Sequence, residues 1–86
     1  MNNDLKYLPP VENLEFIFPN LTPFGRNLRY MRHLNNLSVE KLAKLAQVGA
    51  HTLSRAENGR GHMRVETLRA LACALNCTVS ELLKGV

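Results

Sequence analysis

The side chains best able to bind a metal ion or act as nucleophiles are two cysteines and three histidines, and their spacing forms no site. Cys73 and Cys77 lie four residues apart, and His33, His51 and His62 stand at no ligand spacing from them. A zinc site needs more ligands at tighter pairing. No Ser/His/Asp or Cys/His set shares a plausible site, and the sequence has no phosphate-binding glycine loop. We therefore expect no metal, no cofactor and no enzymatic activity, and we interpret both cysteines as reduced core or near-core residues.

Positive charge is the remaining chemical signal, and it is unevenly distributed. Residues 24–86 hold ten basic and four acidic side chains, a net charge of +6, whereas residues 1–23 hold one basic and three acidic ones, a net charge of −2. An excess of this kind suits a polyanion such as nucleic acid and makes the binding salt-dependent.

The length of 86 residues and mass of 9.7 kDa predict a single small domain and exclude a two-domain enzyme. The longest uncharged stretch, between Glu15 and Arg26, contains two prolines and is too short and polar to cross a bilayer. The N-terminus lacks the pattern of a secretory signal. We expect a cytoplasmic protein.

Residues 1–23 are predicted to form an N-terminal arm. The chain's four prolines all fall here, and each disfavours a long helix. Residues 14–18 are rich in aromatic and β-branched side chains and resemble a short strand. A lone strand leaves its backbone donors unpaired, so this segment either packs as a strap on the rest of the chain or pairs with its copy in a second subunit. Disorder is the third option.

From Phe24 onward the apolar pattern has the period of helices. We expect helices over residues 24–35, 39–46, 50–58 and 64–75, and a short last helix from residue 79. The predicted inward-facing residues are Leu28, Met31, Leu34, Leu42, Ala43, Leu45, Ala46, Val65, Leu68, Leu71, Ala72, Leu75, Leu82 and Leu83.

Capping residues separate these helices. Ser38 and Gly49 are predicted N-caps, and Thr78 to Glu81 has the form of a capping box. Asn36, Gly59 and Asn76 are expected to end the preceding helices, with both asparagines in the left-handed conformation.

Two short helices over residues 39–46 and 50–58, joined by three residues, are typical of a helix-turn-helix. At this point the sequence resembles the helix-turn-helix domain of the lambda-repressor and Cro type, the XRE family. The resemblance runs over residues 28–83 and includes Leu37-Ser38, Leu42-Ala43, Val48, Thr52-Leu53-Ser54-Arg55, Glu57-Asn58-Gly59, Glu66-Thr67-Leu68, Ala72, Leu75 and Leu82-Leu83. It implies an all-α domain of five helices over residues 24–86.

The resemblance also implies that the helix over residues 50–58 enters the DNA major groove. Its outward residues are the candidate base readers: Ala50, His51, Ser54, Arg55 and Asn58. Arg55 suits this role best, because a guanidinium can bond O6 and N7 of guanine together. The alternative is a solvated helix arginine.

Flanking residues would then hold DNA phosphates. The candidates are Ser38, Lys41, Lys44, Thr52, Arg60, His62 and Arg64. For any one of them, ordinary surface charge is the alternative. The resemblance further implies a partly buried, structural ion pair between Arg32 and Glu57.

Four residues depart from the family pattern. Val39 replaces a common glutamine, Gln47 a glycine in the turn, Gly49 a hydroxyl residue and Met63 a proline. These changes leave the expected fold intact, and Val39 together with Ala50 makes the reading surface less polar.

The resemblance implies a sequence-specific DNA-binding regulator that acts as a homodimer on a palindromic operator. A phage-type repressor, an operon controller and an antitoxin with a toxin partner all fit this description. The alternative is a degenerate helix-turn-helix that binds protein through its arm or its helix surfaces.

Overall fold

Five helices make up the part of the chain that the structure, a computed structural model, describes, which is residues 21–86. They are α2 (Pro23–Leu34), α3 (Val39–Ala46), α4 (Ala50–Glu57), α5 (Val65–Ala74) and α6 (Val79–Leu82). The expected all-helical fold is confirmed over this range. The predicted strand at residues 14–18 lies outside it.

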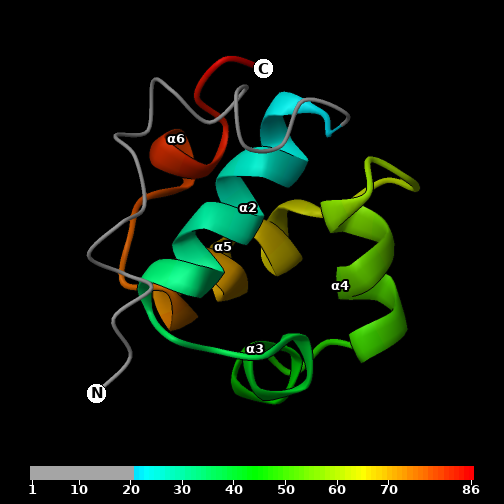
Figure 1. Ribbon diagram of the computed structural model, residues 1–86, viewed down its shortest axis with the longest axis vertical. Helices are drawn as coiled ribbons and strands as arrows, with labels where there is room; N and C mark the ends of the chain where they lie inside the picture. The colour runs from blue at the N-terminus through cyan, green and yellow to red at the C-terminus, as the bar shows by residue number, and fades with distance from the viewer. Residues whose placement is uncertain (1–20) are drawn as a thin grey trace.

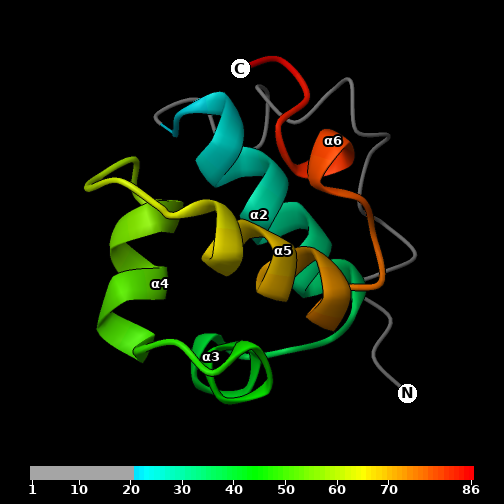
Figure 2. The ribbon, with the colours of Figure 1, turned by 180° about the vertical axis from the view of Figure 1, so that it is seen from behind.

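Helices α2 and α5 lie one behind the other through the middle of the molecule, with α4 on one side and α6 on the other (Figures 1 and 2). Helix α3 packs on both α4 and α5, and α2 packs on α4 and α6. No helix between residues 21 and 86 is long and apolar enough to cross a membrane.

The predicted N-caps are confirmed. The Ser38 side-chain oxygen accepts a hydrogen bond from Lys41 N at 3.0 Å, and Gly49 precedes α4 without a side-chain bond. Thr78 and Glu81 form the full capping box, in which each side chain accepts from the other residue's backbone N–H. Local sequence therefore determines where these helices begin.

Left-handed residues end the helices, as predicted. Asn36, Gly59 and Asn76 have φ angles of 57°, 76° and 55°. After α4, Arg60 N donates to Arg55 O at 2.8 Å and Gly59 N donates to Ala56 O at 3.1 Å. This is the Schellman arrangement, which satisfies carbonyls that the helix leaves unpaired.

Five helix boundaries differ by one residue from the prediction, and one of them is the end of α2, where Asn35 is the cap and not the last helical residue. Helix α2 begins at Pro23 because the Thr22 hydroxyl accepts from Gly25 N at 3.1 Å and proline suits the first helical turn. Asn58 caps α4 instead of belonging to it, and Arg64 and Leu75 cap α5.

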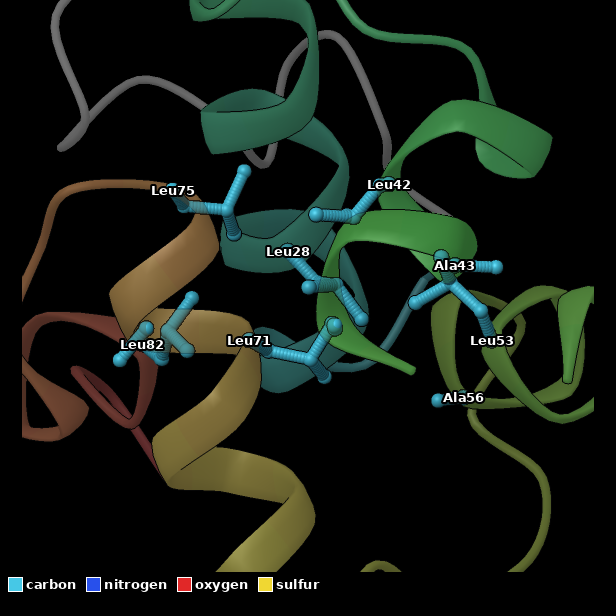
Figure 3. Close-up of a cluster of buried hydrophobic side chains, with 10 residues drawn as sticks. Leu28, Leu42, Ala43, Leu53, Ala56, Leu71, Leu75 and Leu82 are labelled. Carbon is cyan, nitrogen blue, oxygen red and sulfur yellow. The ribbon is translucent and has the colours of Figure 1, made fainter. Parts of the chain in front are cut away.

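Leucines from every helix meet in one core. Leu28, Leu42, Leu53, Leu71 and Leu82 are fully buried, and Leu28 lies in the middle of the labelled side chains in Figure 3. This cluster holds α4 against the other helices.

Three predicted core residues are wrong: Leu34, Leu45 and Val65 are 42%, 53% and 58% exposed. Leu34 is the last residue of α2 and Val65 the first of α5, so both lie where their helices extend past the core. Leu45 lies about 200° around α3 from the buried Ala43, on a flank that the other helices of residues 21–86 leave more than half exposed.

Asn27 is a buried residue that the apolar pattern did not reveal. Its Nδ2 donates to Leu82 O and to Lys84 O, both at 2.8 Å, and the residue is 7% exposed. It therefore joins α2 to carbonyls at the end of α6.

We expect Asn27→Ala to lower the free energy of unfolding by about 1 to 3 kcal/mol, because one buried and one partly buried carbonyl lose their donor. Urea unfolding followed by circular dichroism measures this. Asn58→Ala is the matched control, since the exposed Asn58 side chain bonds only to Ser54 O of its own helix. Equal losses in the two variants would contradict the role given to Asn27.

Candidate nucleic-acid interface

A tight turn places α4 on α3. Gln47 adopts the left-handed conformation, with φ of 58°, and Val48 N donates to Ala43 O at 2.9 Å. Half-buried Val48 and fully buried Leu53 pack into the core beside Ala43. The turn accommodates glutamine where the family pattern has glycine, and one face of α4 remains outside the core.

The outer face of α4 carries most of the predicted base readers. His51, Thr52 and Arg55 are exposed, and Ser54 is half-buried. Ala50 is also half-buried, and it packs against the core. Asn58 is exposed, but its Nδ2 donates to Ser54 O at 2.9 Å, so its amide already caps the helix.

Arg55 extends from α4 over the following loop. Its Nη2 and Nε lie 3.7 and 3.8 Å from the position that a Cβ on Gly61 would occupy. Within residues 21–86, neither of the two ion pairs involves Arg55. Its guanidinium is thus a charged, exposed donor without a carboxylate partner in this range.

The predicted phosphate-binding residues fall into two groups. Ser38, Lys41 and Lys44 are exposed on the first helix of the motif, and Arg60, His62 and Arg64 are exposed in the segment between α4 and α5. A cavity of about 340 Å³ brings together four predicted residues from α4 and this segment, Thr52, Arg55, Arg60 and His62. The lysines of α3 do not line it.

Glu57 lies between two arginines beneath this surface. Arg32 Nε is 2.6 Å from Glu57 Oε2, and Arg32 Nη2 is 3.1 Å from Oε1. Arg29 Nε donates to the same Oε1 at 3.2 Å. Arg32 Nη1 also donates to Leu37 O at 2.9 Å, so this cluster connects α2, the loop before α3 and the end of α4.

Arg29 is the member of this cluster that sequence reasoning missed. The expected ion pair was limited to Arg32 and Glu57, although Arg29 stands about one turn before Arg32 on the same helix face. Three-residue spacing was the available signal, because residues i and i+3 of a helix are neighbours.

The two cysteines lie away from these groups. Cys73 is exposed, which differs from the expected near-core position, and Cys77 is half-buried. Burial raises the pKa of the Cys77 thiol, and the negative charge of Glu81 raises it further. Between residues 21 and 86, no group of three or more His, Cys, Asp and Glu side chains could hold a metal ion.

Comparison with known proteins finds a matching family and several similar proteins. The family model described as "Helix-turn-helix domain" matches residues 23–83. The uncharacterized HTH-type transcriptional regulator RghRB of Bacillus subtilis is 34% identical over 64 residues, which are 73% of this chain and 46% of RghRB. The HTH-type transcriptional regulator DdrOP3 of Deinococcus deserti is 39% identical over 59 residues, 69% of this chain and 46% of DdrOP3.

A third relative and a solved structure match as well. The HTH-type transcriptional activator BcrR of Enterococcus faecalis is 32% identical over 62 residues, 72% of this chain and 30% of BcrR. The chain therefore spans less than half the length of these curated relatives. The crystal structure of the restriction-modification controller protein C.AhdI from Aeromonas hydrophila superposes with a TM-score of 0.68 and 32% identity, over 70% of this chain and 91% of that one.

Proposed function

Because the chain belongs to the helix-turn-helix domain family, we propose that it regulates transcription by binding double-stranded DNA. The observation that carries the proposal is the outer face of α4, where Arg55 projects without a carboxylate partner among residues 21–86. Exposed basic side chains flank this face on both sides. Such a surface can approach a polyanion without having to break an internal ion pair.

Direct base contacts are assigned to the exposed middle of α4. Arg55 is the principal reader, because its fork of donors matches O6 and N7 of guanine. His51 and Ser54 are secondary readers, which donate or accept single hydrogen bonds. Asn58 and Ala50 have smaller roles, since one caps the helix and the other packs inward.

Phosphate contacts are assigned to both flanks of α4. The proposed residues are Ser38, Lys41, Lys44, Thr52, Arg60, His62 and Arg64. Lys41 and Lys44 approach the backbone from α3, and Arg60 and Arg64 do so from the segment between α4 and α5. These contacts position the reading helix without specifying sequence.

The proposed regulator acts as a homodimer on a palindromic site. A helix with about three base-reading side chains specifies few base pairs, and helix-turn-helix dimers place two such helices in successive major grooves. The arm over residues 1–23 is the proposed dimer clasp or strap of the domain over residues 24–86. Similarity to a restriction-modification controller favours the operon-controller form over a phage repressor or an antitoxin with a toxin partner.

Arg55→Ala is expected to weaken binding to a preferred duplex about tenfold to a hundredfold, because a bidentate base contact is worth about 1 to 3 kcal/mol. The duplex is first selected from a randomised pool by the full chain at about 50 mM salt, where phosphate binding is strong. Gel shifts then compare the affinities of the two proteins for this duplex. A second selection with Arg55→Ala should show that one base position of the site is no longer specified.

Two variants control this experiment. Arg69→Ala removes an exposed arginine outside the proposed interface, and it should leave the affinity unchanged. Lys44→Ala should weaken binding to all sequences alike. It should also reduce the slope of log affinity against log salt concentration by about one, the share of one phosphate contact. Absence of any retarded duplex at low salt would refute DNA binding.

The second candidate function is protein binding. The exposed Leu34 and Leu45 favour it, because large apolar side chains on a surface suit a protein partner. Failure of the duplex selection, together with a stable fold, would support this candidate.

A further inference from the structure

A cavity opens between the end of α4, the loop that follows it and the first turn of α2. Its volume is about 340 Å³. Segments far apart in sequence converge there, since the start of α2, the loop after α4 and the C-terminal segment lie at the same end of the molecule in Figures 1 and 2. Phe24, Met63, Leu68 and Leu83 supply apolar walls from four different segments.

The cavity also has a cationic edge. Arg55 and Arg60 both line it, and neither belongs to an ion pair with another residue of the described range. The buried carboxylate of Glu57 is already held by Arg29 and Arg32. Two guanidinium groups beside an apolar cavity therefore have no anionic partner among residues 21–86.

We propose that this cavity binds an amphipathic carboxylate, a small aliphatic or aromatic acid. Its carboxylate bonds to Arg55 and Arg60, whose planar donors match it. Its hydrocarbon body lies against Phe24, Met63, Leu68 and Leu83. Ligand sites commonly have this size and combine mostly apolar walls with a few charged groups.

The choice of ligand follows from the two kinds of lining. A fully polar anion would leave the apolar walls in water, and a neutral hydrocarbon would leave the arginines without a partner. An acid with a hydrocarbon chain satisfies both at once. Inorganic phosphate and neutral alcohols are therefore poor ligands for this site.

Occupation of the cavity opposes DNA binding. Arg55 and Arg60 are also the proposed contacts to a base and to a phosphate, so a bound carboxylate occupies donors of both arginines and offsets one of the two positive charges that DNA requires. Coupling of this kind is reciprocal, and DNA lowers the affinity for the acid by the same factor. This consequence, unlike the site itself, rests on the proposed function.

The test is calorimetric titration of the full chain with octanoate, without DNA. We expect saturable binding of one octanoate per chain, with affinity rising about threefold to fourfold per methylene from butyrate to octanoate. Arg55→Gln and Arg60→Gln should each lower the affinity for octanoate about tenfold, since each variant loses a charge-assisted hydrogen bond. Octanol should bind at least about tenfold more weakly than octanoate for the same reason.

Arg69→Gln is the matched control, because Arg69 is exposed on α5 and does not line the cavity. Its octanoate affinity should equal that of the original chain. Amide chemical shifts that change at Gly61, Met63 and Leu83, and remain constant at Lys41 and Lys44, would locate the ligand independently.

Three results would overturn the site: no saturable binding, equal binding of octanol and octanoate, or binding that neither arginine substitution weakens. Gel shifts with added octanoate then test the coupling alone. Retention of the duplex at saturating octanoate refutes the coupling, whereas failure to bind any duplex refutes the proposed function and leaves the calorimetric result intact.

Discussion

Glu57→Ala is expected to lower the free energy of unfolding by about 3 to 5 kcal/mol, the usual cost of leaving a buried charge without its partner. The Glu57 side chain is 2% exposed, and that of Arg32, which donates two hydrogen bonds to it, is 11% exposed. After the substitution, Arg32 keeps only its bond to Leu37 O. Arg29 is 29% exposed and can turn toward water. Urea unfolding followed by circular dichroism measures the loss.

Glu66→Ala is the matched control for this prediction. Glu66 is an exposed glutamate in the first turn of α5, so its loss should cost no more than about 1 kcal/mol through the helix dipole. A double variant, Arg32→Met with Glu57→Met, should recover most of the stability, because apolar residues of similar size can replace a buried ion pair. Similar losses for Glu57→Ala and Glu66→Ala would refute the structural role of the cluster.

Substitution of Glu57 should lower the stability of the protein without changing which DNA sequence it recognises. At low denaturant, the folded fraction of Glu57→Ala should bind its preferred duplex with unchanged sequence preference, because Glu57 lies on the buried side of α4 and not on its outer face. Arg55→Ala should do the reverse. It should alter the sequence preference and leave the free energy of unfolding within about 0.5 kcal/mol of the original, as is usual for a surface substitution. An altered sequence preference in Glu57→Ala would contradict this division.

Helix ends could be predicted from sequence because their signals are local. Ser38, Thr78, Asn36 and Asn76 act on backbone groups within a few residues of themselves, so their types and positions were sufficient. The wrong core residues have the opposite cause. Periodicity indicates the inward side of each helix, but not how far along that helix its neighbours reach. Leu34 and Val65 lie at the ends of their own helices, past the core.

The candidate site was predictable to a similar extent. The exposed face of α4 follows from the same periodicity that buries Leu53. The contacts of Arg29 and Asn27 with residues 28 and 55 positions away could not be predicted in this way, because they depend on how the helices pack. The position of Arg55 over Gly61, and the cavity beside it, likewise depend on the path of a loop.

Gly25 is the residue whose importance is least visible in the sequence. A Cβ built on it would lie 2.3 Å from the backbone oxygen of Glu57 and 3.1 Å from its carbonyl carbon. The first turn of α2 therefore rests directly on the end of α4. A glycine within a helix often marks such a close approach, and here it sets how near the reading helix lies to α2.

Gly25→Ala is expected to lower the free energy of unfolding by about 1 to 3 kcal/mol or more, as overpacking does. Helix propensity alone predicts the opposite sign, a gain of about 1 kcal/mol, because alanine favours a helix. Urea unfolding distinguishes the two. Gly49→Ala is the control, because a Cβ there would meet only Thr52 Oγ1 at an ordinary 3.6 Å, and the loss should be at most about 1 kcal/mol from a poorer N-cap.

The folded fraction of Gly25→Ala should also bind DNA more weakly, and this result separates it from a purely destabilised variant. The clash involves the backbone of Glu57, so relief requires the end of α4 to shift, and Arg55 and the loop after it shift with that end. Binding measured at matched folded fraction should therefore fall for Gly25→Ala and be unchanged for Asn27→Ala. If Gly25→Ala is as stable as the original chain, the close contact between α2 and α4 is wrong. If it is destabilised but binds normally, the reading helix is positioned by α3 alone.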